Sequence, residues 1–158
     1  MNHAQDQNIP AKDGRAYWRV IVGIMILLLL GGLALSCYPG KWQAAQRVQG
    51  FIDAVNENNP GDIYPYLAPQ LRERISKEDF VRNFSKERSY PYLTPLYLYL
   101  DEVKLDPDQY TGEAILTVAA RLPGEKMHVQ LYYYRGKYYI AAFEDIVDGS
   151  YEEKFKKL

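Results

Sequence analysis

Cysteine and histidine are scarce in this sequence: its 158 residues include one cysteine, Cys37, and two histidines, His3 and His128. A single cysteine excludes an internal disulfide framework and a thiolate cluster for a metal. His3 lies in a polar N-terminal stretch, and the sequence pattern places no aspartate, cysteine or serine beside His128. We interpret His128 as a solvated strand residue rather than a catalytic base. We therefore predict no catalytic, cofactor or metal site, and a protein that is not an enzyme.

An excess of charge of either sign is also missing. The chain has 19 Lys and Arg against 20 Asp and Glu, and residues 43–158 have 15 against 18. A slightly acidic segment lacks the basic surface that nucleic acids require, so we expect no nucleic-acid partner. The length allows one anchor and one globular domain of about 115 residues.

One long run contains no charge at all, residues 20–37. As a helix, residues 20–39 would extend about 30 Å, the thickness of a bilayer's hydrocarbon core. A buried core helix is disfavoured because the run has no polar side to turn toward water. We predict a single-pass transmembrane helix at 20–39 after a disordered tail at 1–19. Aromatic residues suited to the two membrane interfaces flank the run: Tyr17, Trp18, Tyr38 and Trp42.

A cleaved signal is the alternative to an uncleaved anchor. Residues 33–37 read Leu-Ala-Leu-Ser-Cys and resemble the cleavage box of bacterial lipoproteins, in which the cysteine becomes lipidated. Ala34 and Leu35 stand in swapped order relative to that pattern, which favours the uncleaved span over lipidation of Cys37.

Basic residues near the run indicate its orientation. Lys12, Arg15 and Arg19 precede it, and Lys41 and Arg47 follow it within a comparable distance. Because cytoplasmic flanks are enriched in Lys and Arg, this bias favours an N-terminus inside the cell. We expect a cell-membrane protein whose partners include the lipid bilayer and whose C-terminal domain is extracytoplasmic.

The first half of that domain has helical patterns. Residues 42–58 carry an apolar stripe that predicts a surface helix with one buried face. Asp62 is placed to cap a short helix over residues 63–67, and another turn begins at Pro69. Ser76 and Asp79 form a near capping box that predicts a third helix start. The stripe consists of Ala45, Val48, Phe51, Ile52 and Val55.

From Tyr90 onward the period changes to two, which predicts four antiparallel strands at 96–105, 113–122, 127–134 and 138–147. An even-length turn at Pro123-Gly124 pairs even-numbered residues of the second strand with odd-numbered residues of the third. An even-length turn near Gly136 pairs the odd-numbered residues of the third strand with even-numbered residues of the fourth. One face then becomes apolar in all three strands and is predicted to be the core face. Its members are Ala114, Leu116, Val118, Ala120, Val129, Leu131, Tyr133, Tyr138, Ile140 and Ala142.

The same register leaves large side chains on the opposite face, a predicted partner surface made of Ile115, Tyr132, Tyr139 and Phe143. The alternative is that residues 148–158, a C-terminal tail or short helix, cover this face through a capping box at Ser150 and Glu153. Adjacent acidic pairs are expected to point to opposite faces of a strand, so that neither forms a carboxylate dyad. These pairs are Asp101-Glu102 and Glu144-Asp145, with Glu144 expected at the open rim of the sheet.

Helices followed by a curved antiparallel sheet that folds over them resemble the nuclear-transport-factor-two-like superfamily, a cone-shaped α+β fold, over residues 43–147. The carriers are residues 51–55 (Phe-Ile-Asp-Ala-Val), the helix start at residues 76–80 and the closing hairpin at residues 131–140. The expected fold class is α+β: an N-terminal transmembrane helix, then helices packed on a curved four-stranded antiparallel sheet.

Function is less constrained than fold, because that superfamily includes both enzymes and noncatalytic modules. The resemblance and the predicted partner surface favour a noncatalytic extracytoplasmic module that binds an envelope or membrane protein, or associates with itself. The alternative is a small-ligand-binding domain or enzyme that uses the cavity of the cone.

Overall fold

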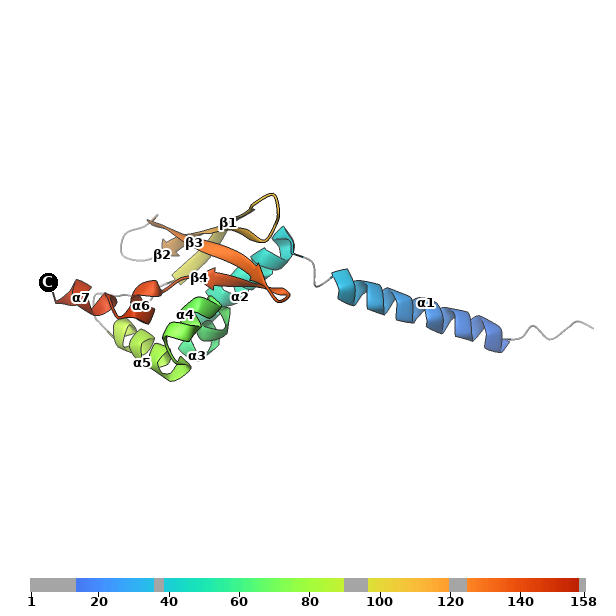
Figure 1. Ribbon diagram of the computed structural model, residues 1–158, viewed down its shortest axis with the longest axis horizontal. Helices are drawn as coiled ribbons and strands as arrows, with labels where there is room; N and C mark the ends of the chain where they lie inside the picture. The colour runs from blue at the N-terminus through green and yellow to red at the C-terminus, as the bar shows by residue number, and fades with distance from the viewer. Residues whose placement is uncertain (1–13, 36–38, 90–96, 120–124, 157–158) are drawn as a thin grey trace, which may run out of the picture. The chain divides into compact units, whose positions relative to one another are not determined.

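The structure is a computed structural model that describes residues 14–35, 39–89, 97–119 and 125–156 (Figure 1). The chain divides into two compact units, Met1–Tyr38 and Pro39–Leu158. Each unit is described by itself below.

The described part of the first unit is one helix, α1 (Gly14–Leu35). It begins inside the segment that the sequence predicts to be a disordered tail. Large apolar side chains from Ile24 to Leu29 are between 51% and 72% exposed. None of the helices that the described residues form is both long and apolar enough to cross a membrane. The predicted span continues through residues 36–38, and Cys37 therefore lies outside the described residues.

The second unit begins with helices, as its patterns predict. They are α2 (Lys41–Asn56), α3 (Pro60–Ile63), the 3-10 helix η1 (Tyr64–Tyr66), α4 (Pro69–Arg74) and α5 (Lys77–Arg88). The amphipathic stripe of α2 is confirmed, because its apolar side lies in the core. Its buried residues are Ala44, Val48, Phe51, Ile52, Ala54 and Val55.

The predicted helix starts have different outcomes. Ser76 caps α5, since its hydroxyl oxygen accepts a hydrogen bond from the backbone N–H of Asp79 at 3.0 Å. The prediction for Asp62 is wrong: α3 starts earlier, with Asn59 at its N-cap position and Pro60 in its first turn. A proline at the first helical position loses no hydrogen bond there, which explains the earlier start.

The second half of the domain is an antiparallel sheet of β1 (Tyr97–Leu105), β2 (Thr111–Ala119), β3 (Glu125–Tyr134) and β4 (Lys137–Ala141), in that spatial order. The predicted parity of pairing is confirmed: even residues of β2 pair with odd ones of β3, as in Ala114 opposite Val129, and odd residues of β3 pair with even ones of β4, as in Leu131 opposite Ile140. The predicted core face is buried except for Val118 and Tyr133, which are half-buried against the core. Ala120 lies outside the described residues. The fold class is therefore α+β, with helices and a four-stranded antiparallel sheet.

The predicted fourth strand is too long. It ends at Ala141, and a short helix follows, α6 (Glu144–Asp148), then another, α7 (Tyr151–Phe155). Phe143 makes the turn between strand and helix in the left-handed region, with φ 58° and ψ 36°. A left-handed residue cannot continue a strand, so the side chains beyond Ala141 no longer alternate between the two faces of the sheet.

Helices α3, α4 and α5 lie on one side of the sheet in Figure 1. Backbone and side-chain hydrogen bonds join the sheet's edges to the helical half. At the β4 edge, the N–H of Ala68 donates to the carbonyl of Ile140 at 3.0 Å. At the β1 edge, the side chain of Asn56 donates to the carbonyl of Leu98 at 3.0 Å and accepts from its N–H at 2.8 Å. These bonds satisfy strand groups that an open edge would expose.

Candidate functional site

The candidate site is the outer face of the sheet, the face that carries the residues opposite the buried ones. Two cross-strand rows define it: Ile115 lies between Glu102 and His128, and Tyr132 lies between Thr111 and Tyr139. The rows above and below these add Tyr97, Tyr99, Lys104, Glu113, Thr117, Lys126 and Gln130.

Phe143 does not belong to this face, although the sequence pattern places it there. Its ring lies 5.7 Å from the ring of Phe51 and 5.4 Å from that of Phe84, measured between centroids. Both of those rings are buried in the core. The cause is the end of β4 at Ala141, after which the chain turns and directs Phe143 toward the helices.

Tyr132 and Tyr139 do meet on the outer face. They are direct partners on β3 and β4, and their ring centroids are 5.9 Å apart. The hydroxyl of Tyr132 donates a hydrogen bond to the side-chain oxygen of Gln70 on α4. Partial burial raises the pKa of the Tyr132 hydroxyl, so this group stays a neutral donor.

Two arginines from the helical half lie against the same tyrosines. The guanidinium carbon of Arg72 is 5.3 Å from the ring centroid of Tyr139, and that of Arg47 is 6.0 Å from it. Arg47 also lies 3.9 Å from the ring centroid of Tyr66. Cations over aromatic faces are attracted by the ring quadrupole. The tyrosine pair is therefore bordered by cations on the side that faces α4.

Ile115 lies instead among polar side chains. On one side of it, His128 Nδ1 is 2.9 Å from the Glu113 carboxylate. On the other side, the Thr117 hydroxyl donates to Asp101 at 2.7 Å and the Lys126 ammonium donates to the same oxygen at 2.9 Å. The hydrogen bonds from Lys126 and Thr117 lower the pKa of Asp101. The exposed apolar area of the outer face is thus divided by charged pairs.

Asp101 and Glu102 correct a further expectation. A β-bulge between Leu100 and Glu102 inserts an extra residue into β1. Both carboxylates then reach the outer face, where Asp101 contacts Lys126 and Glu102 contacts Lys104 at 3.2 Å. The two carboxylates bind separate lysines, so they do not form an acid–base dyad.

His128 is exposed, as predicted, and its partner is Glu113. Within the part of the chain that the structure describes, no group of three or more His, Cys, Asp or Glu side chains is arranged to hold a metal. This face carries aromatic and apolar side chains together with paired polar groups.

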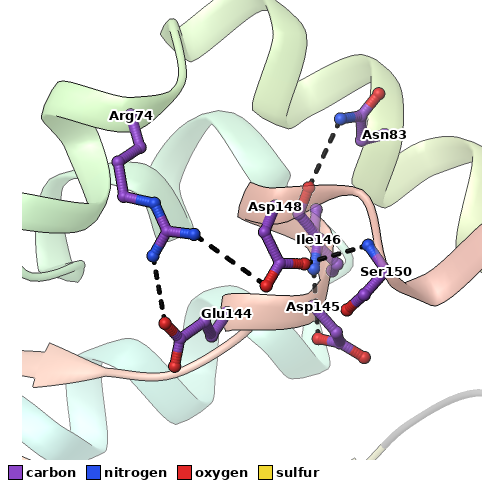
Figure 2. Close-up of polar contacts among 7 residues, drawn as sticks. All are labelled: Arg74, Asn83, Glu144, Asp145, Ile146, Asp148 and Ser150. Atoms are coloured by element: carbon purple, nitrogen blue, oxygen red, sulfur yellow. Dashed lines mark hydrogen bonds and ion pairs between the residues drawn. The ribbon is translucent and has the colours of Figure 1, made fainter.

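Figure 2 shows the residues around α6. Glu144 was expected at the rim of the sheet, but it begins α6 and accepts a hydrogen bond from Arg74 of α4 at 3.0 Å. Asp148 lies 3.9 Å from the same guanidinium, and its pKa is lowered, chiefly because it accepts the backbone N–H of Ser150 at 2.9 Å. The side chain of Asn83 donates to the carbonyl of Ile146 at 3.4 Å. These contacts attach α6 to α4 and α5, and we interpret them as structural.

The C-terminal helix lies against the helical half. Tyr151 is 1% exposed within the core, and the Lys86 ammonium of α5 lies 2.6 Å from the Glu152 carboxylate. The predicted capping box does not form, because the Ser150 side chain makes no capping hydrogen bond. The described part of this segment therefore packs against α5, and the outer sheet face gains no such cover from it.

The sequence pattern missed Arg47 and Arg72 as neighbours of Tyr139, because nothing local links residues so far apart in the chain. Models of known protein families give no match to this chain, and no curated protein matches it.

Proposed function

We propose that this chain is a noncatalytic, membrane-anchored, extracytoplasmic module that binds another protein of the cell envelope through the outer face of its sheet. We define the contact surface as Tyr97, Tyr99, Ile115, Tyr132 and Tyr139. The observation that carries the proposal is that this face bears large side chains opposite the core. Helices α4 and α2 contact its β3–β4 end, where Gln70, Arg72 and Arg47 lie against Tyr132 and Tyr139, while the tyrosines of β1 stay exposed. Tyr97 is 43% exposed and Tyr99 57% exposed, and patches of this kind mark protein contact sites.

The composition of the contact surface supports recognition of a protein. Tyrosine combines a large apolar ring with a hydroxyl and loses little conformational entropy on binding, and it is enriched at interfaces. The ion pair Asp101–Lys126 and the polar pair Glu113–His128 lie among these rings and would supply a polar rim. Exposed pairs of this type add little to the stability of the fold. Their role at an interface would be to favour partners with complementary charges.

The proposed anchor rests on the sequence of residues 20–37, which has no charge, and on the apolar side chains of α1. Six successive residues, 24–29, are apolar and more than half exposed. A helix that is apolar on every side has no face for water, whereas a bilayer can surround it completely. The excess of basic residues before the run supports an N-terminus inside the cell.

The order of elements supports membership of the nuclear-transport-factor-two-like superfamily as part of this proposal. The interior of the domain favours contact over a ligand cavity, because linked aromatic rings occupy the space between the sheet and the helices. Phe143 contacts both Phe51 and Phe84 there, and Phe80 extends the chain of rings at 5.9 Å from Phe84.

The test is partner capture from membranes with variants of the contact surface. Tyr99→Ser and Ile115→Ser together should leave the domain folded and reduce recovery of the cross-linked partner at least tenfold. Tyr110→Ser is the matched control, since Tyr110 is 52% exposed and lies in the turn before β2, outside the contact surface. Unchanged capture by a folded double variant would contradict the proposal.

A further inference from the structure

A depression of about 270 Å³ lies between the start of α2 and the β3–β4 turn. We call it the Arg47 pocket. It is lined by two cations, two amides and two phenol rings, and none of these described residues is acidic: Gln43, Gln46, Arg47, Tyr66, Lys137 and Tyr138. Its walls are joined by a hydrogen bond from the Gln43 side chain to the carbonyl of Gly136 at 3.1 Å.

Arg47 is held in this pocket by uncharged groups. Its Nε donates to the carbonyl of Tyr138 at 3.1 Å, and its Nη2 donates to the carbonyl of Pro65 at 2.8 Å. The ring of Tyr66 lies beneath the guanidinium. Among the residues that the structure describes, no carboxylate forms an ion pair with Arg47. The guanidinium is therefore fixed in position while part of its donor capacity stays unused.

A second cation increases the cost of this arrangement. Burial is the main cause that lowers the pKa of Arg47, and the nearby charge of Arg72 acts in the same direction. The Nε of Arg72 is itself buried, and no described group accepts a hydrogen bond from it. Half-buried charges without a counter-ion are unfavourable, and an anion beside them would remove that cost.

The acidic residues of this region lie on the far side of Arg47. A neighbouring depression of about 410 Å³ shares Arg47 and Tyr66 but is also lined by Asp53, Glu57 and Asp62. An anion would be repelled from that side. The side that carries Lys137 offers a second cation and two amide groups instead.

We propose that the Arg47 pocket binds a phosphate group. Arg47 and Lys137 both line this depression. A guanidinium and an ammonium in one depression can donate several hydrogen bonds to a tetrahedral oxyanion. The phosphate could belong to a soluble molecule or to a lipid head group. The lipid source depends on the proposed anchor, which precedes α2 in the chain. Gln43, Gln46 and Arg47 lie in the first two turns of α2.

The first experiment measures thermal unfolding of the full chain in neutral detergent, with inorganic phosphate titrated against chloride at equal ionic strength. Phosphate should raise the Tm of the wild type, because a ligand that binds only the folded state stabilises it. Lys137→Glu should weaken the apparent phosphate affinity at least tenfold, and Lys137→Arg should retain it. Lys77→Glu changes an exposed lysine at the start of α5 and should leave the titration unchanged.

An equal response to phosphate and chloride in the wild type would overturn the proposal. So would a Lys137→Glu titration identical to that of the wild type. Lys137 makes a safer test than Arg47, whose hydrogen bonds to Tyr138 and Pro65 also support the fold.

The second experiment identifies the source of the phosphate with nanodiscs of phosphatidylglycerol or of phosphatidylcholine. If the anionic lipid occupies the pocket, added phosphate should no longer raise the Tm in phosphatidylglycerol discs, and Lys137→Glu should be less stable there than the wild type. An undiminished response to phosphate in those discs supports a soluble ligand. Neither result depends on the contact surface, so partner capture can fail while the pocket is confirmed.

Discussion

Phe143 offers the sharpest test of the fold, because its ring and its backbone make separate contributions to stability. The ring packs against Phe51 and Phe84, with centroids 5.7 and 5.4 Å away. The backbone is in the left-handed region at φ 58°, which side chains with a Cβ atom adopt at a cost. Phe143→Ala removes the ring and keeps the Cβ atom, whereas Phe143→Gly removes both, so the two substitutions together separate the effects of ring and backbone.

The expected magnitudes follow from these contacts. Phenylalanine to alanine in a core costs about 3 to 5 kcal/mol, and Phe143→Ala should cost less than that, about 2 to 3 kcal/mol, because Phe143 is only half-buried. Phe143→Gly loses the same ring but removes the left-handed penalty of about 1 kcal/mol. Phe143→Gly should therefore be about 1 kcal/mol more stable than Phe143→Ala, the reverse of their usual order in helices and strands.

The assay is urea unfolding of the full chain followed by far-ultraviolet circular dichroism, with the m-value checked for each variant. Phe143→Leu is the matched control, since it keeps apolar volume without the aromatic contacts, and its loss should be intermediate. A glycine variant less stable than the alanine variant would refute the left-handed backbone. A loss below about 0.5 kcal/mol in Phe143→Ala would return Phe143 to the sheet surface, where its ring contributes little.

Three further predictions use the same chain. Leu131→Ala should cost about 2 to 5 kcal/mol in urea unfolding, and a loss below about 0.5 kcal/mol would contradict the register of β3. Ser76→Ala should cost about 1 kcal/mol by removing the cap of α5. The hydrogen bond with the Ser76 hydroxyl is the main cause that lowers the pKa of Asp79 in the folded chain. The stabilisation from ionised Asp79 is therefore present above the ordinary pKa of about 4, and it is lost as the pH falls through the lowered folded pKa. The stability of Ser76→Ala should decrease less on acidification than that of the wild type. If both proteins lose the same stability as the pH falls, the hydroxyl of Ser76 does not stabilise ionised Asp79. A cysteine at Asp108 in a Cys37→Ser chain should react with an impermeant label in intact cells, and reaction only after lysis would reverse the proposed orientation.

The residues of the last three strands that share a face could be predicted because this depends on parity alone. Side chains alternate along a strand, and an even-length turn determines which residues of the next strand share their face. Leu116, Leu131 and Ile140 then have to lie together, and all three are buried. A slip of one residue would have exposed them, so the apolar pattern determines which face is buried. A slip of two residues would keep that face buried, so the exact pairing depends on the loop length as well.

The end of β4 could not be predicted from the same pattern. Beyond Ala141 the apolar residues continue at Ala142, Ile146 and Val147, a spacing that a strand and a short helix share. The distinguishing signal is the acidic pair Glu144-Asp145, since acidic residues favour the first turn of a helix.

The bulge in β1 left a signal that periodicity analysis can detect. The buried or half-buried apolar residues of β1 are Leu98 and Leu100 before the bulge and Val103 and Leu105 after it. Their numbers change from even to odd, which requires one extra residue between them. Asp101 is that residue, and its carboxylate is satisfied on the outer face by Thr117 and Lys126.

The arginines around Tyr139 show what local patterns do not contain. Arg72 reaches Tyr139 because α4 is attached to the edge of β4 through the hydrogen bond from Ala68 to Ile140. Arg47 reaches the same ring from α2 and also forms part of the wall of the Arg47 pocket.

The guanidinium of Arg47 thus borders both the contact surface and the pocket. If a partner covers Tyr139 and an anion binds Arg47, each event changes the electrostatic environment of the other, and the coupling must be reciprocal. Phosphate should therefore change the affinity for the partner by the same factor as the partner changes the affinity for phosphate.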